Sequence, residues 1–144
     1  MIKEVTNIED ANKCDELLTQ LLLDERKYNP TISENTIIKN YFNKLLDDEN
    51  ITLLAYYQES EIIGYILIRK TDPDTYLLDG LYVLEEYRNK KIAKKLITVA
   101  LEKCQALEAK YVDINVMKEN KIALELYKQF DFNEFEIKLR KSLN

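Results

Sequence analysis

The sequence predicts one domain over residues 1–144 with an α/β fold of the α+β type, in which helices flank a mixed, mostly antiparallel twisted sheet. The apolar runs at residues 51–57 and 62–68, joined by a polar Gln-Glu-Ser-Glu segment, are typical of an antiparallel hairpin. A helical pattern between the strands expected near residues 80 and 114 forms a crossover, so those two strands should be parallel. No internal repeat, low-complexity tract or flexible linker divides the chain.

The first part of the chain should contain one short strand and two helices before the hairpin. Residues 2–6 fit a strand, and the apolar positions from Glu9 to Arg26 recur with the spacing of an amphipathic helix. Pro30 marks the loop that follows. A second helix is expected from Ser33 to Asp47, with a buried stripe formed by Ile37, Ile38, Tyr41, Phe42 and Leu45.

The second part of the chain should alternate between strands and helices. A strand from Tyr76 to Leu84 precedes a long helix from about Asn89 to Glu108. Tyr111 to Met117 fits the next strand, a short helix follows from Lys121 to Gln129, and residues 134–143 should form a final strand. In the strand at 111–117, alternation places Val112, Ile114 and Val116 on one face and Asp113 and Asn115 on the other.

The composition of the chain excludes several classes of site. The sequence contains no histidine, so it has no Ser-His-Asp or Cys-His triad and no Cys/His cluster for zinc, and we expect no metal. Cys14 and Cys104 are far apart in the sequence and should be reduced, buried thiols. Any general acid or base must be Asp, Glu, Tyr or Lys, or a water held by them.

The charge and the hydropathy of the chain limit which partners and which cellular location we expect. A formal net charge of −5 argues against general nucleic-acid binding, which relies on a basic surface. No apolar run approaches the ~18 residues that a membrane span requires, and the N-terminus lacks the apolar segment of a signal peptide. We therefore expect a cytoplasmic protein without a nucleic-acid or membrane partner.

The segment EYRNKKIAKKL, residues 86–96, contains five cations within eight residues shortly after a strand. A helix that begins there presents unpaired N–H groups and the positive end of its dipole, which suit a diphosphate. Cations near a helix N-terminus oppose the dipole by roughly 0.3–1 kcal/mol each, and an anionic ligand would offset that cost. The alternative interpretation is a solvated helix face.

The segment NKIALELYKQFDF, residues 120–132, contains a second group of candidate residues. Offsets of three and seven place Asn120, Ala123 and Tyr127 on one face of a helix. A small residue therefore lies between an amide and a phenol and leaves room for a thin ligand. The alternatives are helix capping for Asn120 and simple packing for Tyr127.

Together the two segments resemble the GNAT superfamily of acyl-CoA-dependent N-acyltransferases, over about residues 51–140. The family's phosphate turn, Arg/Gln-x-x-Gly-x-Gly/Ala, falls on Arg88 to Ala93. Its later pattern, Asn-x-x-Ala-x-x-x-Tyr-x-x-x-Gly-Phe, falls on residues 120–132, and the strand containing Ile63-Gly64-Tyr65 is similar to the family's third strand.

Three positions depart from the family's pattern. Glu85 stands in place of a proline, and Lys91 and Asp131 stand in place of glycines. If Lys91 required φ > 0, lysine would cost on the order of 1–2 kcal/mol there, and we expect right-handed helical geometry instead. Asp131 tolerates a left-handed backbone and could still end the helix.

The resemblance implies a GNAT-like sheet with a central, splayed parallel strand pair, and acetyl-CoA as co-substrate with its pantetheine arm in the splay. Backbone groups of Tyr82, Val83 and Leu84 would bind the pantetheine amides. The other cofactor-binding residues that it implies are Arg88, Asn89, Lys90, Lys91, Ile92, Ala93 and Lys94 at the diphosphate, with Asn120, Ala123 and Tyr127 on the later helix.

The activity that the resemblance implies is acetyl transfer from acetyl-CoA to a primary amine, by direct attack in a ternary complex. The sequence does not identify the acceptor, which could be a small-molecule or a peptide amine, and the C-terminal strand could pair across a homodimer. The alternative is a non-catalytic CoA-binding sensor or interaction domain.

Two residues are candidates for proton transfer. Tyr127 would protonate the departing CoA thiolate, since a thiol of pKa near ~8.5 can take a proton from a nearby phenol of pKa ~10. Asp79 is the candidate general base, because strand alternation places it in an apolar row where burial would raise the pKa of a lone carboxylate. That row consists of Leu77, Asp79, Leu81 and Val83. The alternatives for Asp79 are a salt bridge to a lysine or a solvent-facing position, and Asp113 and Asn115 are the reserve candidates for holding the amine.

Overall fold

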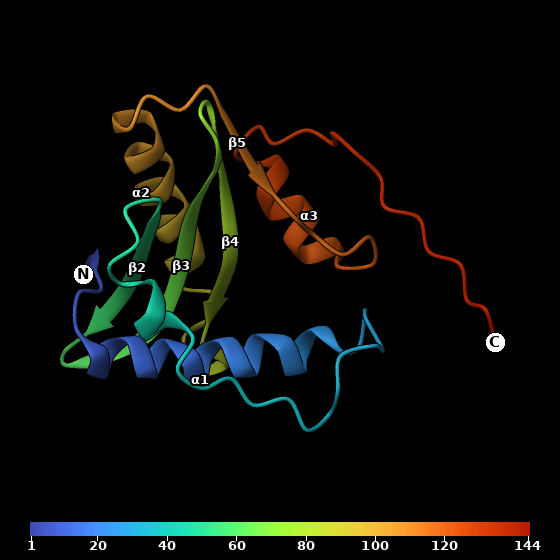
Figure 1. Ribbon diagram of the computed structural model, residues 1–144, viewed down its shortest axis with the longest axis horizontal. Coiled ribbons are helices and arrows are strands. Elements are labelled where there is room, and N and C mark those ends of the chain that lie inside the picture. The colour runs from blue at the N-terminus through green and yellow to red at the C-terminus, as the bar shows by residue number, and fades with distance from the viewer.

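The computed structural model describes all residues from 1 to 144 and contains one five-stranded sheet with helices on both faces (Figure 1). The strands lie side by side in chain order: β1 (Ile2–Glu4), β2 (Ile51–Gln58), β3 (Glu61–Asp72), β4 (Thr75–Val83) and β5 (Tyr111–Ile114). Neighbouring strands are antiparallel except β4 and β5, which are parallel. The predicted mixed sheet, its hairpin and its parallel crossover are therefore confirmed.

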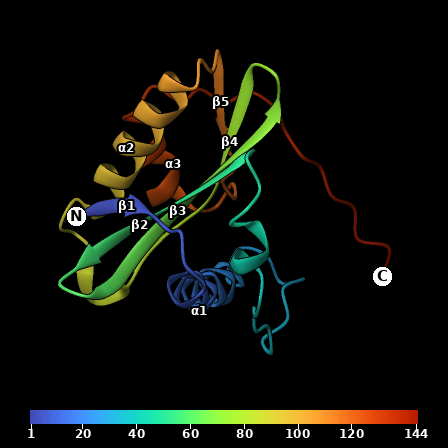
Figure 2. The same ribbon diagram turned by 60° about the vertical axis from the view of Figure 1, so that its left-hand side comes forward.

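Three α-helices cover the sheet. α1 (Ile8–Glu25) lies on one face, and α2 (Ile92–Ala106) lies on the other, with α3 (Lys121–Lys128) on the same side as α2 (Figure 2). α1 begins where the side chain of Asn7 accepts a hydrogen bond from the Asp10 N–H at 2.8 Å. None of the helices has the length and apolar character needed to cross a membrane.

The sheet separates two apolar cores. Phe42 and Tyr65 pack with residues of α1 on one side, whereas Leu96 and other residues of α2 pack on the opposite side. Cys14 lies in the first core and Cys104 in the second, both as buried free thiols, as predicted. Burial raises the pKa of Cys14 to about 12 and that of Cys104 to about 11, so neither is a thiolate nucleophile at neutral pH.

The predicted helix from Ser33 to Asp47 is wrong. Only a short 3₁₀ turn, η1 (Phe42–Leu45), forms in this segment. The Ser33 hydroxyl accepts a hydrogen bond from the Asn35 N–H at 3.1 Å, and such local side-chain bonds compete with helical ones. Asn40 has a φ of +55°, which also interrupts a helical path.

Two polar side chains of α1 hold this irregular segment against the helix. The buried Asp15 carboxylate accepts hydrogen bonds from the N–H groups of Phe42 at 3.0 Å and Tyr41 at 3.4 Å. Thr19 Oγ1 accepts another from the Ile38 N–H at 2.9 Å. These bonds place Phe42 in the core and Tyr41 beside β3 and β4.

The predicted C-terminal strand at residues 134–143 is wrong within the single chain. From Asn133 onward the chain pairs with no strand and runs away from the sheet beyond α3 (Figures 1 and 2). Its large apolar side chains are exposed. The alternation of the segment suits a strand, but no edge of the same chain pairs with it.

A bulge in β4 changes which side chains share a face. Leu78 pairs with Ile68 and Leu81 with Ile66, so two residues of β4, Asp79 and Gly80, lie opposite one residue of β3. Gly80 has a φ of +110°, which suits a glycine. Leu78 and Leu81 consequently pack in the same core, and the predicted apolar row containing Asp79 does not exist.

β4 and β5 separate beyond this bulge. Their pairing ends at Leu78 and Ile114, whereas β4 continues to Val83 paired only with β3 (Figure 1). This is the splayed parallel pair that the resemblance implied, and it leaves one edge of β4 open.

Candidate active site

The loop between β4 and α2 enters the helix through left-handed residues. A 3₁₀ turn, η2 (Glu85–Tyr87), follows β4, and φ is +64° at both Asn89 and Lys91. The expectation of right-handed geometry at Lys91 is therefore wrong. The chain has to turn sharply from η2 into α2, and a non-glycine residue pays roughly 1–2 kcal/mol for the left-handed conformation that does this.

Six consecutive backbone N–H groups in this turn are free. None of the N–H groups from Asn89 to Lys94 donates a hydrogen bond within the chain, and no side chain caps the N-terminus of α2. Lys91 has a left-handed backbone conformation and Ile92 a right-handed one. This combination lets successive N–H groups point into one concave anion site, and the helix dipole adds partial positive charge there. The turn thus retains the geometry of a phosphate site although it contains no glycine.

Unpaired lysines surround these free N–H groups. Lys90, Lys91, Lys94 and Lys95 are exposed and take part in none of the five salt bridges of the chain. The Lys90 ammonium lies 5.5 Å from the centre of the Tyr87 ring. The predicted concentration of cations at one helix start is therefore present and uncompensated.

Arg88, the fifth cation, is used within the fold. Its Nε donates to the Val83 carbonyl at 2.9 Å, its Nη2 donates to Asp24 at 3.3 Å, and its guanidinium lies 5.1 Å from the centre of the Tyr82 ring. Its backbone N–H donates to the Glu85 carbonyl at 3.2 Å. Arg88 therefore ties the end of β4 to α1, and its backbone N–H is not free to bind a phosphate.

The open edge of β4 presents Val83. The Leu84 N–H donates to the Ile63 carbonyl of β3 at 2.9 Å, so by strand alternation Tyr82 also points its backbone groups towards β3. The backbone groups of Val83 point the other way, into the splay, where Arg88 occupies the carbonyl and the N–H stays free. Of the three backbone positions expected to bind pantetheine, the geometry favours Val83.

α3 places the second group of candidate residues beside the splay. The Asn120 side chain accepts a hydrogen bond from the Ala123 N–H at 3.2 Å, so it caps the helix. The Tyr127 hydroxyl makes no hydrogen bond within the chain, and its ring meets Phe132 edge-on at 6.3 Å. Burial, and secondarily the charge of Glu25, raises the pKa of Tyr127 to about 12. Asp131 has a φ of +66°, so it accepts the left-handed conformation at the end of this helix, as expected.

Asp79 forms a salt bridge, with an arginine in place of the expected lysine. Arg69 Nε donates to the Asp79 carboxylate at 3.1 Å, and Arg69 Nη2 donates to the Tyr41 hydroxyl at 3.0 Å. The Asp79 side chain is 42% exposed. The reserve candidates Asp113 and Asn115 are both exposed, at and just beyond the end of β5.

Glu25, the last residue of α1, is a site residue that sequence reasoning missed. Its carboxylate has no salt-bridge partner, and burial raises its pKa. Its charge contributes to the raised pKa values of the Tyr127 and Tyr65 phenols. The sequence holds no signal for this role, because Glu25 resembles any polar residue at a helix end.

Tyr65 lies under the bulge of β4. Its hydroxyl is buried without a hydrogen-bond partner, and a Cβ atom at Gly80 would lie 3.0 Å from it. The missing side chain at Gly80 thus makes room for the phenol. Burial raises the pKa of Tyr65 well above its ordinary value.

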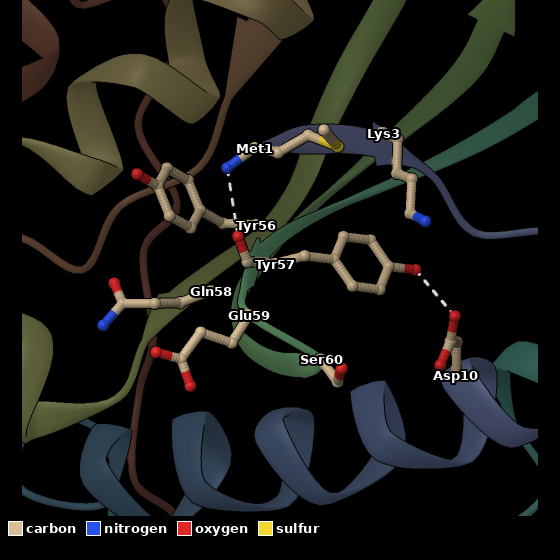
Figure 3. A pocket seen from close by; sticks show the side chains of 8 residues that line it. All are labelled: Met1, Lys3, Asp10, Tyr56, Tyr57, Gln58, Glu59 and Ser60. Atoms are coloured by element: carbon tan, nitrogen blue, oxygen red, sulfur yellow. Dashed lines mark hydrogen bonds between the residues drawn. The ribbon is translucent and has the colours of Figure 1, made fainter.

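A cavity of about 610 Å³ belongs to a different part of the surface (Figure 3). It lies between the N-terminus, the β2–β3 turn and the start of α1, and no residue of the phosphate turn, β4, β5 or α3 lines it. Its polar groups bond to one another: the N-terminal ammonium donates to the Tyr57 carbonyl at 3.0 Å, and the Tyr57 hydroxyl donates to Asp10 at 2.8 Å (Figure 3). We assign it no role in acetyl transfer.

Two curated proteins are similar to this chain in sequence. The catalytic subunit NAA10 of the N-terminal acetyltransferase A complex from Arabidopsis thaliana is 28% identical over 114 residues, which cover 74% of this chain and 59% of that protein. The N-alpha-acetyltransferase daf-31 from Caenorhabditis elegans is 29% identical over 102 residues, which cover 67% of this chain and 56% of that protein. The matched part is therefore less than two thirds of the length of these relatives.

Solved structures share the fold along the whole chain. A mutant of the BH1408 protein from Bacillus halodurans has a TM-score of 0.86 at 20% identity, covering 100% of this chain and 99% of that one. The aminoglycoside N-acetyltransferase AAC(6')-Iy in complex with CoA has a TM-score of 0.74 at 18% identity, covering 99% of both chains. The model of the acetyltransferase (GNAT) family matches residues 15–132. Because this match spans most of the 144 residues and includes both the phosphate turn and α3, the chain belongs to the GNAT acetyltransferase family.

Proposed function

We propose that the protein is an acetyl-CoA-dependent N-acetyltransferase that transfers an acetyl group to a primary amine by direct attack, with both substrates bound together. The free N–H groups from Asn89 to Lys94 carry the proposal, because they lie at a helix start after an open strand edge and would bind a diphosphate there. Family membership and the acetyltransferase names of the similar proteins support it.

The residues present suit acetyl-CoA as the co-substrate. The N–H groups from Asn89 to Lys94 and the unpaired lysines around them would hold the diphosphate. The free N–H of Val83 would bond a pantetheine amide, as an added strand does, and Ala123 leaves space beside it. Acetyl-CoA would supply an activated acyl group, and the residues of the chain would hold that group in position for attack.

Tyr127 is our proposed general acid. When the amine nitrogen attacks the thioester carbonyl and the C–S bond breaks, the departing sulfur needs a proton. The Tyr127 hydroxyl is protonated at neutral pH and makes no hydrogen bond within the chain, so it is free to donate. The two cysteines are buried thiols and take no part.

Glu25 is our proposed general base, in place of Asp79. The apolar row on which the prediction for Asp79 rested does not exist, and the Asp79 carboxylate already accepts a charge-assisted bond from Arg69. Glu25 has no such partner and acts on Tyr127, the proposed acid. We assign Asp79 and Arg69 to positioning the acceptor, which is a small-molecule or peptide amine.

Ligand binding tests the cofactor site directly. Acetyl-CoA should raise the melting temperature of the full chain, and free CoA should compete with it. Lys94→Glu should weaken this binding several-fold, whereas Lys39→Glu, the same charge change on the loop after α1, should not. An absent shift with wild-type protein would remove the basis for the diphosphate site.

Turnover separates an enzyme from a CoA-binding sensor. Release of free CoA thiol in the presence of an amine acceptor is expected, and a sensor would show the thermal shift without it. Tyr127→Phe keeps the packing and should lower kcat by roughly 10²-fold. An unchanged rate would make Tyr127 a packing residue.

The pH profile of kcat/KM identifies the base. A base must be deprotonated to act, so the rate should fall as the pH falls through its pKa, which burial places above the ordinary value for Glu25. Glu25→Gln should abolish this acidic limb, and the matched Asp79→Asn variant should keep it. The reverse pattern would return the role of base to Asp79.

A further inference from the structure

Arg69 of β3 is held in a fixed position on the α1 face of the sheet. Ile68 and Leu78, which pair with each other in β3 and β4, pack in the core beneath α2. Arg69 and Asp79 follow them in the two strands, so strand alternation turns their side chains to the opposite face. There the Arg69 Nε donates to Asp79 at 3.1 Å, and its Nη2 donates to the Tyr41 hydroxyl at 3.0 Å.

These two hydrogen bonds leave one end of the Arg69 guanidinium free. Both N–H groups of Nη1 and the second N–H of Nη2 make no hydrogen bond or salt bridge within the chain. This end of the planar fork matches a carboxylate, whose two oxygens accept two parallel hydrogen bonds from it. The Arg69 side chain is 30% exposed, so a ligand can reach the free end.

Tyr41 holds the guanidinium and offers a donor of its own. Its backbone is tied to α1, because the buried Asp15 carboxylate accepts hydrogen bonds from the N–H groups of Tyr41 and Phe42. The Tyr41 hydroxyl accepts from Arg69, so its own proton is free for an oxygen of the same ligand. A guanidinium held on two sides loses little conformational entropy on binding, which favours a specific site.

Arg69 lies next to the inner end of the splay between β4 and β5. Its partner Asp79 is the first residue of β4 beyond the end of the pairing with β5. α2 and α3 cover the other face of the sheet, so an acceptor would reach the splay from the α1 face (Figure 2). α1 ends on this face at Glu25, the proposed base.

Given the acetyl transfer proposed above, we propose that the acceptor amine carries a carboxylate, which the free end of the Arg69 guanidinium binds through Nη1 and Nη2. The substrate class is therefore small amino acids, whose amine turns to Glu25 while the carboxylate bonds Arg69 and Tyr41. A polyamine fits less well, because its second ammonium would compete with Arg69 for Asp79. A peptide N-terminus has a neutral amide in place of the carboxylate, and a neutral oxygen makes a weaker hydrogen bond to a guanidinium.

Paired acceptors test the carboxylate directly. Glycine, leucine, phenylalanine, β-alanine and 4-aminobutyrate are each compared with their own primary amide, which keeps the amine and removes the negative charge. Release of CoA thiol gives kcat/KM, expressed per concentration of unprotonated amine because acid and amide differ in amine pKa. At least one acid should exceed its amide by roughly tenfold, the lower range for charge-assisted hydrogen bonds. Equal rates within every pair, or faster amides, would overturn the proposal.

A lysine at position 69 tests the role of the fork. Arg69→Lys keeps a positive charge but loses the planar pair of donors, so the ratio of acid to amide should fall several-fold, mainly through a higher KM for the acid. The matched control Arg140→Lys makes the same exchange in the exposed segment after α3 and should keep the wild-type ratio. An unchanged ratio in Arg69→Lys would show that another group binds the carboxylate.

Binding without turnover separates this site from the proposed activity. In the presence of CoA, the N-acetyl derivatives of the five acids should raise the melting temperature of the full chain more than the N-acetyl derivatives of their amides. Turnover of acids and amides at equal rates would refute the carboxylate site and leave the enzyme. Selective binding of the acids without release of CoA thiol would support the site and refute the activity. Neither binding nor turnover would overturn both.

Discussion

Replacing Lys91 with glycine should make the protein more stable, because Lys91 holds a backbone conformation that glycine adopts without strain. Its φ and ψ are +64° and +18°, in the left-handed region. A side chain there costs roughly 1–2 kcal/mol, whereas glycine loses roughly 0.5–1 kcal/mol through the greater freedom of the unfolded chain. The difference predicts that Lys91→Gly raises the free energy of unfolding by about 0–1.5 kcal/mol.

Lys91→Ala is the matched control for this prediction. Alanine keeps the Cβ atom and its strain but loses the ammonium, which is exposed and makes no salt bridge. Its stability should therefore stay close to that of the wild type. Urea unfolding of the ligand-free wild type and the two variants measures the difference in the free energy of unfolding. In thermal unfolding, each 1 kcal/mol should shift the melting temperature by roughly 2–4 °C in a chain of this size.

Lys91→Gly should lower the affinity for CoA although it raises the free energy of unfolding. The backbone strain at residue 91 is the same with and without ligand, so relieving it leaves the free energy of CoA binding unchanged. The loss of the ammonium group weakens binding, because the group no longer attracts the diphosphate. A partly screened pair contributes about 0.2–1 kcal/mol, so both variants should bind CoA up to about fivefold more weakly. Lys91→Gly less stable than Lys91→Ala would refute the left-handed geometry. Tighter CoA binding by the glycine variant would show that the Cβ atom, and not the charge, governs this position.

Three further changes test other parts of the structure. Burial raises the pKa of Tyr127 from near 10 in the unfolded chain to about 12 in the folded one. The buried, protonated phenol therefore contributes fully to the free energy of unfolding below pH 10, and this contribution declines between pH 10 and 12. At pH 11 the wild type should thus lose about 1.4 kcal/mol of unfolding free energy relative to Tyr127→Phe, and an equal loss in both proteins would contradict the burial of the phenol. Gly80→Ala should destabilise the fold by at least about 1–2 kcal/mol, since φ is +110° and the new methyl would lie 3.0 Å from the Tyr65 hydroxyl; unchanged urea unfolding would argue against the bulge. Asp15→Ala should cost about 1–3 kcal/mol and speed hydrogen exchange at the Phe42 N–H, because that buried donor loses its acceptor; slow exchange in the variant would mean that something else holds the loop.

The sequence predicted most elements of the fold and a candidate position for the site, but it wrongly predicted a helix at residues 33–47. The periods of apolar residues predicted the hairpin, the crossover and three helices at residues 9–26, 89–108 and 121–129, which the structure has at residues 8–25, 92–106 and 121–128. Alternation and helical spacing are local properties of a chain, so they can be recognised in the sequence. The helix start and the family resemblance together predicted a phosphate turn at residues 88–94, and helical spacing predicted the cap at Asn120, which the structure contains. The sequence also predicted a strand at residues 134–143, where the apolar residues alternate as in a strand but the single chain provides no partner strand.

Only the tertiary structure decided how the site is assembled. A bulge one residue long at Asp79 and Gly80 resets the alternation of β4; a glycine inside a strand is typical of a bulge, but it does not tell which side chains change face. The left-handed conformation at Lys91 arises because the turn has to join a strand end and a helix start whose positions are fixed by the two cores. The Arg88 side chain binds Val83 and Asp24, and the charge of Glu25 contributes to the raised pKa of Tyr127, which lies 102 residues further along the sequence. Such contacts depend on where the sheet and helices lie relative to one another, and this arrangement is set by packing across the whole chain.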